Sequence, residues 1–168
     1  GQGGPGAWVR LRHRREHRGD AVARRSPRRY RDRVRELDVV GVRVEMPSNS
    51  PIVLLRERDG ERYLPIWVGG PEASAIAFAQ QGVVPPRPMT HDLLRNLIEA
   101  FGRRLEEVRI VAIRDSVFHA ELAFDGGLTV ESRSSDAIAL ALRVGCRIVG
   151  AEEVLEAGGV AVPSDDED

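Results

Sequence analysis

The stretch Tyr63–Ala73, with the sequence YLPIWVGGPEA, decides the fold because it changes from strand to helix within a few residues. Its first six residues are apolar, with aromatic and β-branched side chains, which is typical of a strand. Gly69 and Gly70 end that pattern, and Pro71 and Glu72 suit the first turn of a helix. The chain is therefore predicted to combine sheet and helix in one unit.

The residues before this stretch predict two further strands. Residues 37–46 (LDVVGVRVEM) alternate between apolar and polar side chains, and residues 47–50 (PSNS) form a turn. Residues 52–55 (IVLL) begin a second strand, and Asp59-Gly60 is a hairpin signal ahead of residue 63. Together the three strands predict an antiparallel meander.

The residues after it predict two helices, three strands and a buried helix. The helices cover residues 71–81 and 90–101, the strands 107–113, 117–124 and 128–132, and the last long helix 135–144, followed by a short helix at 151–155. Turns are expected at Asp115-Ser116 and at residues 125–127. The order βββ-αα-βββ-α predicts an α+β fold with antiparallel or mixed sheets and about three to four helices.

Charge divides the chain into a basic extension and an acidic domain. Residues 1–35 carry twelve Arg against three acids, a net charge of +9, whereas residues 36–168 carry thirteen Arg against twenty-three acids, a net charge of −10. Residues 1–36 have no apolar period and predict a disordered extension, with a nucleic-acid-binding arm as the alternative. Residues 37–163 are expected to form the domain, and residues 164–168 an acidic tail.

Composition indicates a soluble protein of the cytoplasm. No apolar stretch is long enough to span a bilayer, and the Arg-rich start lacks the apolar run of a secretory signal. The single cysteine, Cys146, excludes an intrachain disulfide and fits a reducing compartment. All 25 basic residues are arginine, which we interpret as a coding bias of a GC-rich genome.

Candidate chemical groups stand at predicted helix starts, since phosphate-binding loops and metal-binding motifs are missing from the sequence. Glu72, His91-Asp92 and Asp136 each lie in a first helical turn. An imidazole beside a carboxylate suits acid–base or metal chemistry. Acids in a first turn are equally explained by capping and by the helix dipole.

Other polar residues have two interpretations. His119 and Glu121 share one face of a predicted strand, either as a site or as the solvated face of a sheet. The guanidinium groups of the remaining candidates suit phosphate, although each is also explained as a surface or ion-pair residue. These candidates are Arg87, Arg95, Arg133 and Arg143.

Four ordered segments resemble the bifunctional nuclease family, a bacterial and plant domain. They are residues 64–77 (LPIWVGGPEASAIA), 87–93 (RPMTHDL), 118–122 (FHAEL) and 135–143 (SDAIALALR). The resemblance covers residues 37–163, and the opening at residues 37–46 is similar to actinobacterial members. Members usually have Tyr at the position of His119 and Pro at that of Ser134. Many bacterial members also continue into a charged helical segment, whereas this chain ends in acidic residues.

The resemblance implies an α+β domain that assembles as a homodimer or a larger homo-oligomer and cleaves DNA and RNA. By matching position it carries over five polar residues and one phosphate contact, Arg133. The five are Glu72, His91, Asp92, Glu121 and Asp136.

Three hypotheses follow for the function. In the first, Asp136, Asp92 and Glu121 hold Mg²⁺ or Mn²⁺ for phosphodiester hydrolysis, His91 moves protons, and Arg133, Arg87 and Arg95 contact nucleic acid. In the second, the domain is a non-enzymatic regulatory or assembly module, and its acidic surface repels nucleic acid. In the third, only the Arg-rich extension contacts nucleic acid.

Overall fold

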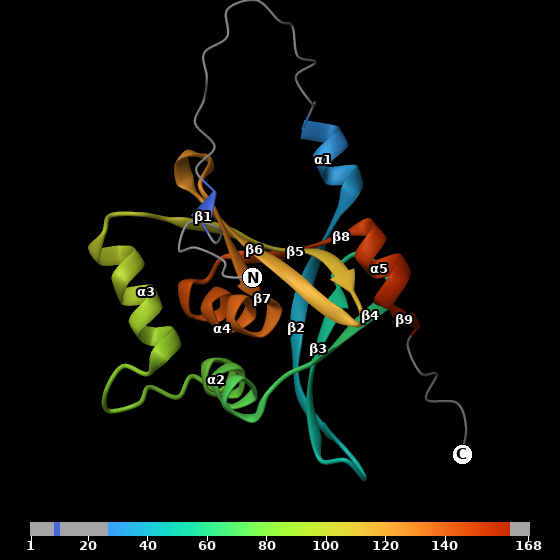
Figure 1. The fold of residues 1–168 in the computed structure, drawn as a ribbon, viewed down its shortest axis with the longest axis horizontal. Coiled ribbons are helices and arrows are strands. Elements are labelled where there is room, and N and C mark those ends of the chain that lie inside the picture. Colours follow the sequence, from blue (N-terminus) through green and yellow to red (C-terminus); the bar gives the residue numbers. More distant parts are fainter. Residues whose placement is uncertain (1–8, 11–26, 162–168) are drawn as a thin grey trace, which may run out of the picture.

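The computed structural model describes residues 9–10 and 27–161, and these form one mixed sheet with helices packed around it (Figure 1). The strand order is β1-β7-β6-β5-β8-β2-β3-β4-β9. The strands are β1 (Val9–Arg10), β2 (Val34–Glu45), β3 (Ser50–Glu57), β4 (Arg62–Trp67), β5 (Leu105–Arg114), β6 (Val117–Phe124), β7 (Thr129–Arg133), β8 (Arg147–Ala151) and β9 (Val160–Ala161). The helices are α1 (Pro27–Arg33), α2 (Gly70–Gln80), α3 (Thr90–Ala100), α4 (Ser134–Val144) and α5 (Glu152–Gly158), with a 3₁₀ turn, η1 (Asp125–Gly127).

The predicted α+β class and the order βββ-αα-βββ-α are confirmed, and the described residues add the two-residue strands β1 and β9, the strand β8 and the helix α1. Strand β8 was missed: it pairs parallel to β5 and antiparallel to β2, and so joins the two predicted meanders into one sheet. It is only five residues long and begins two residues after Gly145, which ends α4, so it gives little sequence signal. Helix α1 makes five α-helices, against the three to four expected.

The N-terminal boundary lies earlier than the predicted Leu37. Strand β2 begins at Val34, and α1 precedes it directly and contacts it. Tyr30 of α1 donates a hydrogen bond to the buried carboxylate of Glu107 on β5. Residues 27–36 therefore belong to the folded unit. The rest of the predicted extension, apart from residues 9–10, and the acidic tail at 164–168 lie outside the described residues.

Helix α4 is the centre of the core. Seven of its eleven residues are buried, including Ile138 and Leu140. Each fully buried large aliphatic side chain stabilises the fold by about 1.5–3 kcal/mol relative to exposure. The helix contacts β5, β6 and β7 on one side and α2 and α3 on the other. It ends at Gly145, whose φ of 81° lies in the left-handed region that glycine adopts without strain.

The turn between β5 and β6 is the two-residue turn predicted from the sequence. Asp115 and Ser116 both have positive φ, 49° and 63°. That combination matches the right-handed twist of a tight hairpin. The turn places Ser116 and Val117 close to the C-terminal end of β4, where both line a pocket with Trp67.

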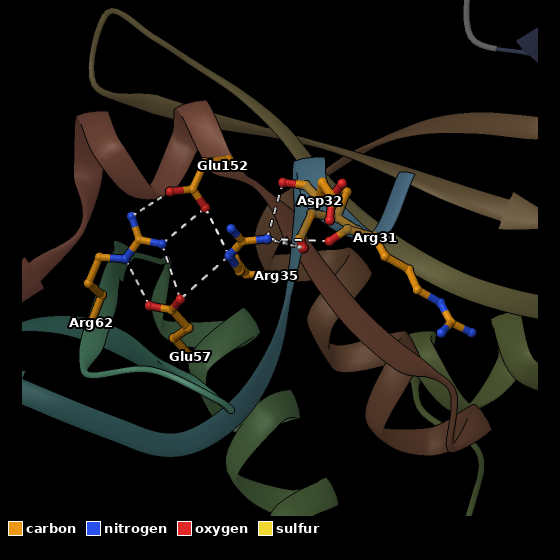
Figure 2. Close-up of polar contacts among 7 residues, drawn as sticks. Arg31, Asp32, Arg35, Glu57, Arg62 and Glu152 are labelled. Atoms are coloured by element: carbon orange, nitrogen blue, oxygen red, sulfur yellow. Dashed lines mark hydrogen bonds and ion pairs between the residues drawn. The ribbon is translucent and has the colours of Figure 1, made fainter. Parts of the chain in front are cut away.

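An ion-pair network ties β2, β3, β4 and α5 together (Figure 2). Arg62 donates two hydrogen bonds to Glu57, of 2.8 and 3.1 Å, and two to Glu152, both of 3.0 Å. Arg35 lies 3.1 Å from Glu152 and 3.8 Å from Glu57. The hydrogen bond from Arg62 is the largest cause of a lowered pKa at both Glu57 and Glu152. Bidentate geometry of this kind is the strongest form of such pairs.

No helix in the described part of the chain is long and apolar enough to cross a membrane.

Replacing Arg62 with Gln should lower the free energy of unfolding at pH 7 by about 2 kcal/mol, because Glu57 is buried and loses its partner. The lowered pKa of each glutamate means that its stabilising effect is present above the ordinary value of 4.5 and is lost as pH falls through the folded-state pKa. The loss of stability below pH 4.5 should therefore be shallower in the variant. Urea unfolding across pH measures both effects.

Arg104→Gln is the matched control, because Arg104 is exposed and its guanidinium pairs with exposed Glu106 and with no other acid among the described residues. An Arg62→Gln protein with wild-type unfolding midpoints at pH 7 and pH 4 would show that this network contributes nothing to stability.

Candidate functional site

The first turns of three helices and the end of one strand meet at a pocket of about 200 Å³. Helices α2 and α3 both pack against α4, which brings their N-terminal turns close to the junction between β7 and α4. The polar side chains that line the pocket are Glu72, Thr90, His91, Arg133, Asp136 and Arg143. Four of these six are residues predicted as catalytic or nucleic-acid-binding.

His91 and Asp136 form the pair at the floor of this pocket. The Nε2 atom of His91 lies 3.0 Å from Oδ1 of Asp136. His91 is 8% exposed and is the one buried residue of α3. A carboxylate in this position holds the imidazole in one orientation. The pair therefore has the geometry of a general base with an orienting carboxylate.

Arg133 joins two of the carboxylates. Its Nε donates to Oδ2 of Asp136 at 2.8 Å, and its Nη2 donates to Oε1 of Glu72 at 2.9 Å and to Oδ1 of Asp136 at 3.2 Å. Partial burial raises the pKa of Asp136, but the hydrogen bonds from Arg133 and His91 outweigh burial and the net pKa is lowered. Asp136 is therefore ionised at neutral pH.

Asp92 has a structural partner of its own. Its Oδ2 accepts a hydrogen bond of 3.0 Å from the backbone N–H of Met89, which caps α3, and its Oδ1 accepts one of 2.8 Å from Arg143. Arg143 also donates to the carbonyl oxygens of Ala139 and Ala75. Burial raises the pKa of Asp92, and these hydrogen bonds lower it further than burial raises it. Asp92 thus anchors α3 to α4 and α2.

Capping explains only one of the three first-turn acids. Asp92 caps its helix, as the alternative interpretation predicted. Glu72 and Asp136 make no hydrogen bond to a backbone N–H at the start of α2 or α4 within the described residues. Glu72 and Asp136 are held by Arg133 instead.

Besides Asp92, three predicted site residues do not line this pocket. Glu121 lies on β6, directly opposite Arg109 of β5 and Glu131 of β7, and it does not line the pocket. Arg87 is exposed in the segment between α2 and α3. Arg95 lines a separate pocket of about 280 Å³ with Asp92 and Arg143.

The arrangement does not fit the predicted metal site. Within residues 9–10 and 27–161, no three His, Cys, Asp or Glu side chains are placed to hold a metal ion. Asp136 and Asp92 each accept hydrogen bonds from an arginine, and Glu121 lines neither of their pockets. A divalent cation of the Mg²⁺ type needs several oxygen ligands around one point.

Arg143 was predicted only as a phosphate-binding candidate, and the structure gives it a different role. Its side chain is almost fully buried, and it contacts α2, α3 and α4 at once. The signal in the sequence is a single arginine at the end of an otherwise apolar helix. A guanidinium there needs several buried acceptors, which indicates that other elements close over it.

Comparison with known proteins agrees with the resemblance. Residues 53–163 match the family described as Bifunctional nuclease domain. Two uncharacterized proteins of Mycobacterium tuberculosis, one from strain H37Rv and one from strain CDC 1551, are each 53% identical over 133 residues. That match covers 79% of this chain and 81% of each relative. The chain belongs to the bifunctional nuclease domain family.

Proposed function

We propose that this domain hydrolyses phosphodiester bonds in DNA and RNA at the pocket lined by Glu72, His91, Arg133 and Asp136. The observation that carries the proposal is the His91–Asp136 pair, 3.0 Å apart and beside the guanidinium of Arg133. Family membership supports the same class of reaction. The pair supplies a base, and the arginine supplies charge for a phosphate.

His91 acts on the attacking water. Its imidazole takes a proton from the water as the water oxygen bonds to phosphorus, and Asp136 stabilises the imidazolium that forms. The bond between phosphorus and the ester oxygen then breaks, and the imidazolium returns the proton to that leaving oxygen. The proton taken from water is thus the proton given to the product hydroxyl, and no other reactant is consumed.

Arg133 is available to offset charge on the phosphate. Its hydrogen bonds to protein use Nε and Nη2, and Nη1 has no hydrogen-bond partner among the described residues. Its side chain is largely exposed. The two protons on Nη1 can therefore approach a phosphate oxygen while Asp136 and Glu72 hold the guanidinium plane in place. A guanidinium fixed at the pocket matters because the domain as a whole is acidic and would otherwise repel the phosphate.

His91→Ala and Asp136→Asn should each reduce cleavage of single-stranded DNA and RNA by about 10²–10⁴-fold, the usual contribution of a positioned proton-transfer group. Gel assays on highly purified protein measure the rate, with EDTA in one series and Mg²⁺ or Mn²⁺ in another. Circular dichroism and thermal unfolding establish that each variant folds. Arg104→Gln, at an exposed and remote arginine, is the control and should cleave like wild type.

The mechanism above is supported if, in EDTA, the wild-type protein cleaves nucleic acid and the His91→Ala protein does not. Full activity in the folded His91→Ala protein, or no cleavage by wild type under any of these conditions, contradicts it.

The second candidate function is that of a non-enzymatic assembly domain, and one specific surface favours it. Helix α3 is amphipathic, yet Leu93, Leu94 and Leu97 are all exposed. Exposed leucines at this spacing form an apolar face of the kind that subunit interfaces use. We propose that this face pairs with a second copy of the chain, in line with the homo-oligomer that the resemblance implies.

Leu93→Asp combined with Leu97→Asp should convert the oligomer to a monomer, because two charges would be buried without partners at the interface. Multi-angle light scattering measures the mass, and Val44→Asp, an equally exposed apolar residue on β2, is the control. A wild-type protein that is monomeric at high concentration, or a double variant with unchanged mass, excludes this interface.

A further inference from the structure

A second pocket, of about 250 Å³, adjoins the candidate active site on the other side of Arg133. The end of β4, the turn between β5 and β6, and the start of α4 enclose it. One side is apolar and the other polar. The apolar side is lined by Trp67, Val117 and Phe118, and the polar side by Arg133, Ser134 and Ser135.

Trp67 gives this pocket an accessible aromatic wall. The alternation of β4 places Leu64 and Ile66 in the core, whereas Trp67 is 57% exposed. An indole left in water at the rim of a pocket offers a large flat surface that gains free energy when another ring covers it. Stacking of a nucleobase on such a ring is worth about 1–3 kcal/mol per base and does not depend on the base identity.

Ser134 and Ser135 give the pocket its polar end. They are only 6% and 7% exposed, and neither hydroxyl makes a hydrogen bond within the described residues. No fully buried side-chain oxygen in that part of the chain lacks a partner. These hydroxyls must therefore keep some access to solvent, and both residues line the pocket. They are also the first two residues of α4, whose free N–H groups favour negative charge.

Arg133 connects the two pockets, since it lines both. A nucleotide unit has the matching layout, with a flat apolar base at one end and a phosphate at the other. With its base against Trp67 and its phosphate near the start of α4, the adjoining phosphate group would lie toward His91. The volume is below the roughly 300–1,000 Å³ of sites for drug-sized ligands, which suits one base rather than several.

We propose that this second pocket binds one nucleobase of single-stranded nucleic acid, stacked on Trp67, and so positions the strand for cleavage. The proposal rests on the proposed function for the substrate class. A base in a duplex is already stacked on its neighbours, so the pocket selects unpaired strands, loops or ends.

The experiment uses the intrinsic fluorescence of Trp67. The chain has two tryptophans, so Trp8→Phe makes Trp67 the single reporter, and His91→Ala in the same protein prevents cleavage during the titration. Short oligo(dT) and oligo(rU) strands should quench Trp67 emission saturably. A hairpin-free duplex of the same length should quench it at least tenfold more weakly.

A labelled single strand, followed by fluorescence anisotropy, tests the contribution of the ring itself. Trp67→Ala should weaken binding by about 5–150-fold, the equivalent of the stacking free energy of one base. Ser134→Ala with Ser135→Ala should weaken it less. Phe101→Ala, which removes a ring that is 75% exposed at the end of α3, is the matched control and should bind like the parent protein.

The outcomes separate this inference from the proposed function. Quenching without cleavage by the His91-containing protein supports the base pocket and contradicts the nuclease mechanism. Two other results would overturn the base pocket while cleavage by the His91-containing protein leaves the mechanism standing. In one, the strands bind without quenching Trp67. In the other, Trp67→Ala binds as tightly as the Phe101→Ala control. Equal quenching by duplex and single strand overturns the proposed selectivity.

Discussion

Burial of α4 between the sheet and two other helices is the constraint on which the rest of the structure depends. Its alanine-rich sequence lets α2 and α3 approach closely, and its large aliphatic side chains fill the core. Because α2 and α3 both pack against this one helix, their first turns are brought to its first turn. The pocket with His91 and Asp136 is thus a result of close packing rather than of a dedicated loop.

Arg62 and Arg133 each bridge two carboxylates, and their roles differ. Arg62 links Glu57 to Glu152 at the junction of β3, β4 and α5, where the pairs hold elements together. Arg133 links Glu72 to Asp136 at the pocket, where its hydrogen bonds to these acids use Nε and Nη2. In a domain with a strong excess of acids, each bridging guanidinium removes the repulsion between two neighbouring carboxylates.

The sequence allowed the individual helices, strands and turns to be predicted, but it did not show which of them come together around the pocket. Glycine and proline at the ends of α2 and α4, and positive-φ residues at the turn between β5 and β6, act within a few residues and leave a clear pattern. Glu72, His91 and Asp136 were predicted because helix starts concentrate polar groups, and Arg133 because a guanidinium suits phosphate and the family resemblance carries it over. Glu121 lies away from the pocket. Alternation along a strand shows which residues share a face of the sheet, but it does not show what that face lies against. The role of Arg143 depends on acceptors from three helices, which only the packed chain supplies.

Strand β8 lies between β5 and β2 in the middle of the sheet, although it is almost the last strand of the chain. The two halves of the sheet therefore cannot be joined by this strand until residues 147–151 have been synthesised. A chain interrupted before that point would expose two unpaired inner edges, which are templates for wrong strand pairing. Closure of the central sheet thus depends on a strand that follows most of the other strands in the sequence.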